Sequence, residues 1–296
     1  MELRLPAVHA YLLNSSLTRE MAQQQAVDKR LTIVAGGLSG LFSRPKPEEV
    51  DLTWSEFRWE PFWHIVATMR YVFERNKSFT VPVTGAEVRK VTLLGQEFEV
   101  VTASPQQPQQ SSPAGFLQQI GQQIGIAGTV TRTFSVPGVE HCLDENRQER
   151  FLDAVAGQAV SAGADYVKKD KAELNDLSAL SANEALTVAP QTKAAQVLRG
   201  LLATMVKQIQ ADTLLEEATT IETFDLYFRP IYAFEFTWRS KSKTAVVEFD
   251  GVTGNMINGK VVRTSNSFMP AELFDVDASN AASLFPPTVT QVQLVS

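Results

Sequence analysis

Residues 61–83 have the sequence PFWHIVATMRYVFERNKSFTVPV, and this stretch decides the fold prediction. From Trp63 to Phe73 every second residue is apolar, while the intervening positions are mixed. Side chains alternate between the two faces of a strand, so the pattern predicts a strand with one face toward the core. The polar residues 75–78 predict a tight turn, and residues 79–83 a returning strand.

Two further hairpins are predicted outward from this stretch. Residues 87–102 alternate around a turn at Gly95-Gln96 and extend the first hairpin into an antiparallel meander. Aromatic residues alternate at the start of residues 230–249, which carry a basic tip at 239–243. The sequence Asp-Gly-Val-Thr-Gly at 250–254 then predicts a turn.

A helical period replaces the strand period in the middle of the chain. We predict helices at residues 144–160, 166–182 and 192–218 from apolar residues spaced three and four apart. Near the N-terminus, a short helix at 15–27 and a strand at 31–35 are expected. The apolar face of the longest helix consists of Leu198, Leu201, Leu202, Met205 and Ile209.

These patterns predict an α+β fold, in which antiparallel hairpins and meanders pack on a central helical segment. Three segments are expected: an N-terminal α+β region at 1–103, a Gln/Pro/Ser-rich loop or linker at 104–143, and helices followed by a hairpin at 144–296. The third segment is compatible with one compact domain shared with the first. The hairpins at 61–83 and 230–249 share a plan, which leaves open a weakly duplicated α+β unit.

Composition limits the chemistry. The chain has one cysteine, three histidines and a formal net charge of −6. A single cysteine excludes a disulfide framework within one chain, and no segment has the positive excess of a dedicated nucleic-acid binder. No secretory leader or membrane-spanning stretch is recognised, so a soluble cytoplasmic protein is expected. No cofactor is expected.

The C-terminal hairpin resembles the PepSY-type module and related small α+β repeats of uncharacterised bacterial proteins. The resemblance covers about residues 190–263 and is carried by residues 232–236, by the return strand 246–249 and by the acidic, Thr-Gly-containing turn at 250–254. It implies a binding or regulatory element that consists of a helix followed by a hairpin.

Several side chains are candidates for binding. His64 shares a strand phase with Arg70 and Glu74, and this His–Arg–Glu cluster could bind an anion on an exposed sheet face. The two predicted tips carry basic residues beside aromatic ones, as a nucleic-acid surface requires; these are Arg75, Lys77, Arg239, Lys241 and Lys243. His141 and Cys142 are adjacent, so a strand would direct them to opposite faces, and no metal site is predicted.

Three functions stay open at this point. The favoured one is a non-enzymatic module that binds a protein partner, or a second copy of itself, through a sheet or helix face. An enzyme with a carboxylate and histidine site, using His64 and His141 between the two sheet regions, is an alternative, because such residues need no local motif. Anion or nucleic-acid binding at the basic tips is the third.

Overall fold

The computed structural model of the chain describes residues 2–35, 45–102, 132–175, 180, 185–258 and 291–295. This part of the chain is mostly β-strand and has a large mixed sheet, accompanied by three α-helices. The predicted α+β fold, with sheets packed on a central helical segment, is therefore wrong. Most residues expected in the central helices extend the strands instead.

The helices are short in comparison with the longest strands. The α-helices are α1 (Arg19–Ala35), α3 (Gly163–Tyr166) and α4 (Ala194–Met205), and the 3-10 turns are η2 (Pro47–Glu49) and η4 (Arg239–Lys241). The first seven strands are β1 (Glu2–Pro6), β2 (His9–Leu13), β3 (Val50–Val83), β4 (Lys90–Leu93), β5 (Gln96–Glu99), β6 (Val101–Thr102) and β7 (Arg132–Asp153). The others are β8 (Lys171–Glu173), β9 (Leu186–Thr187), β10 (Thr213–Trp238), β11 (Lys243–Asp250), β12 (Met256–Asn258) and β13 (Gln291–Val295).

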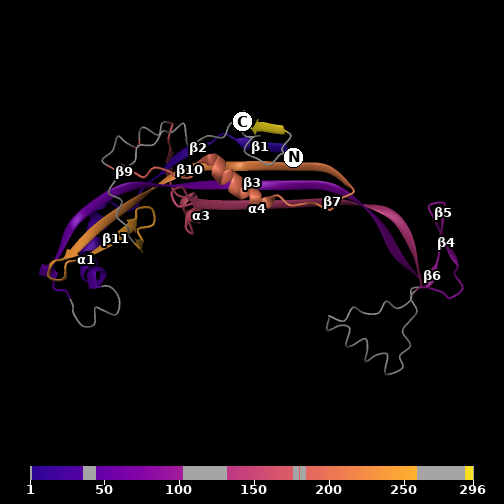
Figure 1. Ribbon diagram of the computed structural model, residues 1–296, viewed down its shortest axis with the longest axis horizontal. Helices are drawn as coiled ribbons and strands as arrows, with labels where there is room; N and C mark the ends of the chain where they lie inside the picture. Colours follow the sequence, from indigo (N-terminus) through magenta and orange to yellow (C-terminus); the bar gives the residue numbers. More distant parts are fainter. Residues whose placement is uncertain are drawn as a thin grey trace, which may run out of the picture. The chain divides into compact units, whose positions relative to one another are not determined.

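Eleven of these strands form one sheet, whose main path is β12-β11-β10-β3-β7-β6. The long strands β3, β7 and β10 are neighbours in this path (Figure 1). Strands β1 and β2 pair with β10 in parallel, β13 pairs with β1, β8 with β2, and β9 with β3. Strands β4 and β5 form a separate hairpin.

Strand β3 is a single strand of 34 residues, so the predicted turn at residues 75–78 does not form. Contacts on both sides keep this segment extended. The Asn76 N–H donates to the carboxylate of Asp212, which immediately precedes β10, at 2.6 Å, and Lys77 pairs with Glu140 on β7. Neighbouring strands thus override the turn preference of the local sequence.

Strand β7 occupies residues expected to form a linker and then a helix. Residues 132–143 begin this strand, and its burial alternates with the period of two that a strand requires. The strand ends where the Asp153 carboxylate accepts hydrogen bonds from the N–H groups of Val155 and Ala156, at 2.8 and 2.7 Å. The predicted helix at 144–160 is therefore wrong.

The other helix predictions are partly correct. Helix α4 buries Leu198, Leu201 and the other apolar residues of its expected face up to Met205, but the chain is extended from Val206. In place of the predicted helix at 166–182, the described residues include the end of α3 and strand β8, and 31–35 continue α1 instead of forming a strand. Helix α1 covers one end of β10 and β11, where Ala22, Ala26 and Val34 share a core with aromatic residues of those strands.

The predicted hairpins at 87–102 and 230–249 both form. The turn of the first lies at Leu94-Gly95 rather than at Gly95-Gln96, and because β4 and β5 form a sheet separate from β3, the predicted meander is wrong. Leu94 and Gly95 both have positive φ, at 53° and 80°, as a two-residue hairpin turn of type I′ requires. Strand β10 pairs with β11 across the η4 tip, from Ile231↔Asp250 to Trp238↔Lys243. Because residues 61–83 form one strand rather than a hairpin, the shared plan behind the suggested duplication is absent.

Two compact units divide the chain. Unit 1 comprises Met1–Arg70, Asp144–Gln208 and Glu216–Ser296, and unit 2 comprises Tyr71–Leu143 and Ile209–Leu215. Strands β3, β7 and β10 each contribute residues to both units. The expected Gln/Pro/Ser-rich stretch lies mainly outside the described residues, as do the glycines at 36–40.

Candidate functional site

Unit 2 carries most of the exposed apolar side chains of the described surface. Among the described residues, eleven large hydrophobic ones are exposed, and all except Met21 and Met256 belong to unit 2, which leaves nine. These nine are Phe79, Val81, Leu93, Leu94, Val101, Val139, Leu143, Leu214 and Leu215. We call them the unit 2 apolar surface. Such a concentration is unusual for a surface that faces only water.

Little core lies beneath this surface. Among the described residues of unit 2, the buried hydrophobic side chains are Tyr71, Phe73 and Phe134. In unit 1, by contrast, both faces of β3 are buried from Pro61 to Ala67. Within the described residues of unit 2, few apolar side chains are therefore packed into a core beneath the sheet.

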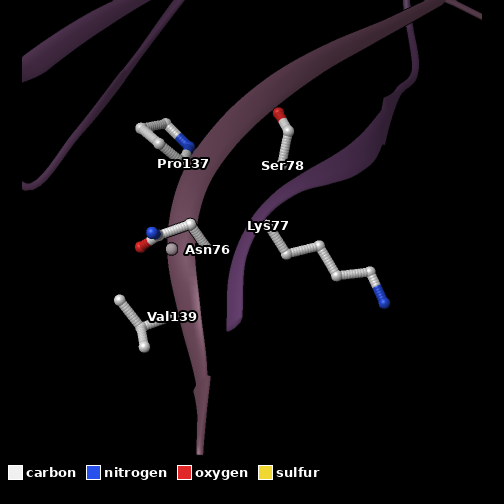
Figure 2. Close-up of a pocket in the computed structure, with 6 residues that line it drawn as sticks. Asn76, Lys77, Ser78, Pro137 and Val139 are labelled. Carbon is white, nitrogen blue, oxygen red and sulfur yellow. The ribbon is translucent and has the colours of Figure 1, made fainter. Parts of the chain in front are cut away.

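An open pocket of about 580 Å³ lies between β3 and β7 within unit 2 (Figure 2). It is lined by Asn76, Lys77, Ser78, Pro137, Gly138 and Val139. Gly138 leaves room for the Phe79 ring, because a Cβ at this position would lie 2.8 Å from one of its ring carbons. The Lys77 side chain points away from Asn76, and its ammonium is 2.6 Å from the Glu140 carboxylate.

The predicted basic tips do not form a pair of free cationic sites. Arg75 and Lys77 lie within β3 rather than at a tip; Arg75 donates to the Gln210 carbonyl at 2.9 Å. At the true tip in unit 1, Arg239 pairs with Asp51 at 2.8 Å and Lys243 donates to the Ala35 carbonyl at 3.3 Å. Lys241 is exposed in η4.

His64 and Arg70 do not form the predicted anion site. The His64 side chain is only 10% exposed, with Nε2 2.9 Å from the Glu149 carboxylate and its ring stacked on Phe151 at 4.6 Å. Arg70 is an exposed partner of Glu216, at 3.6 Å. The sheet face expected to be exposed is thus covered at His64, because β7 contributes its own side chains there.

Among the described residues, His141 forms no site with Cys142 or with His64. His141 lies 3.0 Å from Glu74 and is exposed, whereas Cys142 is half-buried, as expected for neighbours on opposite faces of a strand. His64 belongs to unit 1 and His141 to unit 2. No group of three or more potential metal ligands occurs among the residues that the structure describes.

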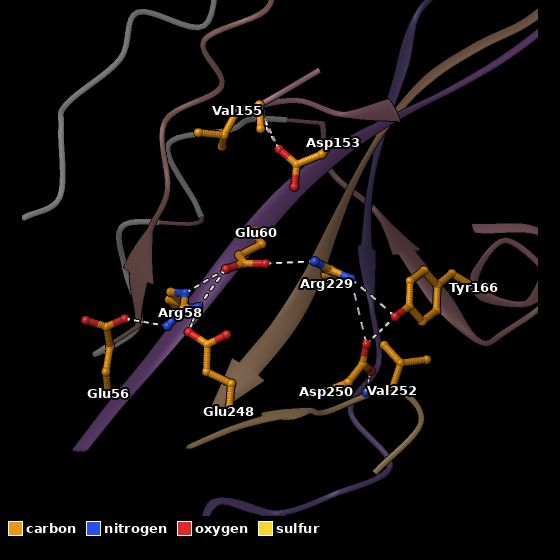
Figure 3. Close-up of polar contacts among 11 residues, drawn as sticks. Glu56, Arg58, Glu60, Asp153, Val155, Tyr166, Arg229, Glu248, Asp250 and Val252 are labelled. Atoms are coloured by element: carbon orange, nitrogen blue, oxygen red, sulfur yellow. Dashed lines mark hydrogen bonds and ion pairs between the residues drawn. The ribbon is translucent and has the colours of Figure 1, made fainter. Parts of the chain in front are cut away.

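Sequence reasoning missed a buried ionic cluster in unit 1 (Figure 3). Arg58 has a side chain 1% exposed and pairs with three glutamates: Glu56 at 3.0 Å, Glu60 at 2.7 Å and Glu248. Its signal was the alternation Glu56-x-Arg58-x-Glu60, which places three charges on one face of a strand.

The cluster continues through Arg229. This residue pairs with Glu60 at 2.9 Å, and the Tyr166 hydroxyl donates to Asp250 beside it. Burial would raise the pKa of Glu60, but the charges of Arg58 and Arg229 outweigh it and leave that pKa below its usual value. Burial and the Asp250 carboxylate raise the pKa of Tyr166 to about 12.

The cluster connects elements rather than facing a ligand. It joins β3, β10, β11 and α3 through side chains that solvent hardly reaches. Charges buried in this way are stable only in mutual contact, so the cluster fixes the relative positions of these elements within unit 1.

Comparison with known proteins adds no relative: no family model, curated protein or solved structure matches this chain. The PepSY-type resemblance of residues 190–263 stays a prediction. None of the described helices is both long and apolar enough to cross a membrane.

Proposed function

We propose that this protein is a non-enzymatic interaction module, and that unit 2 binds another protein chain through its apolar surface. The observation that carries the proposal is the distribution of exposed large apolar side chains: of the eleven among the described residues, nine fall in unit 2. Exposed apolar side chains are the kind of surface that protein contact sites bury.

The small core of unit 2 supports the same function. Thin sheets need a packed apolar face for stability, and few described side chains provide one here. A bound partner would remove this surface from water, at about 25 cal/mol for each Å² of apolar area.

The charges of unit 2 favour a protein partner over a nucleic acid. Its sequence has six acidic residues (Glu74, Glu87, Glu97, Glu99, Glu140 and Asp212) and five basic ones (Arg75, Lys77, Arg89, Lys90 and Arg132). Six against five leaves a nearly neutral surface. The partner that fits is a protein surface with apolar side chains and little net charge.

Site-specific photo-crosslinking in the cells that express the chain tests this proposal. A photoreactive residue replaces Leu143 or Leu215 in unit 2, which are 61% and 57% exposed. The matched controls are Met21 and Met256 in unit 1, which are 52% and 50% exposed. We expect covalent protein adducts from the unit 2 positions. Equal yields at all four positions, or no adducts, would contradict the proposal.

A further inference from the structure

We propose that Leu94 is the residue by which unit 2 anchors its protein partner, and that its side chain fills an apolar pocket of that partner. This inference rests on the proposed function of unit 2. It adds the point of attachment and the shape of the partner surface, which is a concave apolar pocket that receives the tip of the β4–β5 hairpin.

The first observation is the exposure of Leu94. This residue is 97% exposed, whereas the next most exposed large hydrophobic residue of the described chain, Leu143, is 61% exposed. The space around the turn is open, because a Cβ added at Gly95 would meet no atom within 4 Å beyond the adjoining residues. Leu94 is therefore a single protruding apolar side chain, and the anchors of protein interfaces are side chains that fill a pocket of the partner.

The second observation is the backbone at the same residue. Leu94 has a φ of 53°, and among the described non-glycine residues only Ser242 also has a positive φ. A two-residue turn of type I′ needs positive φ at both central positions, where asparagine, aspartate and glycine are preferred. A leucine here is strained as well as exposed, and the fold itself explains neither property. Strain of this kind concentrates at functional sites.

The hairpin that carries Leu94 has little support of its own. Strands β4 and β5 form a two-stranded sheet that pairs with no other described strand. Away from the tip, Phe98 contacts β7, with its ring centroid 5.8 Å from that of Phe134. Isolated two-stranded hairpins are marginally stable in water. A partner that encloses the tip would stabilise the end of the hairpin that lies farthest from this contact.

The composition of the hairpin favours a protein pocket over a lipid bilayer. Anionic membranes attract basic segments. In residues 87–99 three acidic side chains outnumber two basic ones, which leaves a net charge of −1; they are Glu87, Glu97 and Glu99 against Arg89 and Lys90. Leu93 and Leu94 together also have fewer apolar carbons than one myristoyl chain, which by itself binds membranes only marginally.

Replacement of Leu94 tests this inference, with a photoreactive residue at Gln96 as the reporter. Gln96 is exposed and pairs with Leu93 across the turn, so both leucines stay in place. Leu94→Asn removes the apolar side chain and supplies a residue that the turn prefers, whereas Leu94→Met keeps an apolar side chain. We expect Leu94→Asn to lower the yield of protein adducts at least about tenfold, as loss of an interface anchor does, and Leu94→Met to retain it.

Three further readouts separate anchoring from other roles. Urea unfolding of Leu94→Asn should give a midpoint no lower than that of the wild type; a lower midpoint would show that Leu94 belongs to the fold, and would overturn the inference. Mass spectrometry of the adduct should place the attachment site beside apolar residues of the partner; a charged, convex site overturns it as well. Flotation with phosphatidylcholine or phosphatidylserine vesicles should show no binding. Vesicle binding that Leu94→Asn abolishes would assign the tip to a membrane instead.

This inference and the proposed function fail separately. If adducts form from Leu143 or Leu215 but not from Gln96, only the assignment of Leu94 is wrong. The same holds if adducts form from Gln96 in equal yield with Leu94→Asn. If no adducts form from any of these positions, both fail.

Discussion

Replacement of Arg58 by methionine should destabilise the protein strongly. The Arg58 side chain is 1% exposed, and its guanidinium neutralises Glu56, Glu60 and Glu248. Its removal leaves buried carboxylates without a counter-charge, which costs about 3–5 kcal/mol when one partner of a buried ion pair is deleted. At about 2–4 °C per kcal/mol for a large domain, the melting temperature should fall by about 6–20 °C.

Urea titration followed by circular dichroism measures this loss. Arg4→Met provides the matched control, because Arg4 also pairs with a glutamate but has a side chain 44% exposed. Exposed pairs contribute about 0–1 kcal/mol. A loss for Arg58→Met no larger than that for Arg4→Met would refute the reasoning.

Two further measurements separate charge from packing. In the triple variant with Glu56 and Glu248 also replaced by methionine, most of the lost free energy of unfolding should be recovered. The third carboxylate, Glu60, still has its ion pair with Arg229 at 2.9 Å. In Arg58→Met alone, the carboxylates that lose the Arg58 guanidinium should have higher pKa values in the folded state than in the unfolded state. Protonation of these carboxylates then favours the folded state, so the difference in free energy of unfolding between wild type and Arg58→Met should shrink as the pH falls. A difference that does not change with pH would indicate lost packing instead.

Other variants test the remaining contacts. Tyr166→Phe should cost about 1–3 kcal/mol in urea unfolding, because the buried Asp250 carboxylate loses its hydroxyl donor. The pKa of Tyr166 is raised to about 12, so the stability due to its protonated form is present below about pH 10 and is lost as the pH rises toward 12. A base titration of unfolding should show this loss in the wild type and not in Tyr166→Phe. Leu215→Lys should abolish photo-adducts from Leu143 while changing the free energy of unfolding by no more than about 0.5 kcal/mol, because Leu215 is 57% exposed. A larger change in stability would show that Leu215 belongs to the fold rather than to a contact surface.

Sequence patterns predicted those elements whose preferences agree with their neighbours. The β10–β11 hairpin has alternating aromatics, a tip with Ser242 in the left-handed region, and a turn in which Asp250 accepts two backbone N–H groups. Each of these signals is local, so the sequence alone was sufficient.

Other elements depend on contacts between distant segments. Phe151 and Leu152 have a spacing compatible with a helix, yet they extend β7, where Phe151 stacks on His64 of another strand. The turn expected at residues 75–78 is suppressed by Asp212, far along the chain. Pairing of this kind leaves no local signature, so local sequence patterns could not predict it.

The partners of β1 have a consequence for biosynthesis. This N-terminal strand pairs with β10 through Glu2↔Ala218 and with β13 through Glu2↔Gln291. At about 5–20 residues per second, a ribosome needs about 15–60 s to reach Gln291 after it has joined Glu2. Contacts between residues so far apart also slow folding itself. The nascent β1 must therefore wait, with Leu3 and Leu5 still exposed to water, and we expect it to be a binding site for chaperones during this interval.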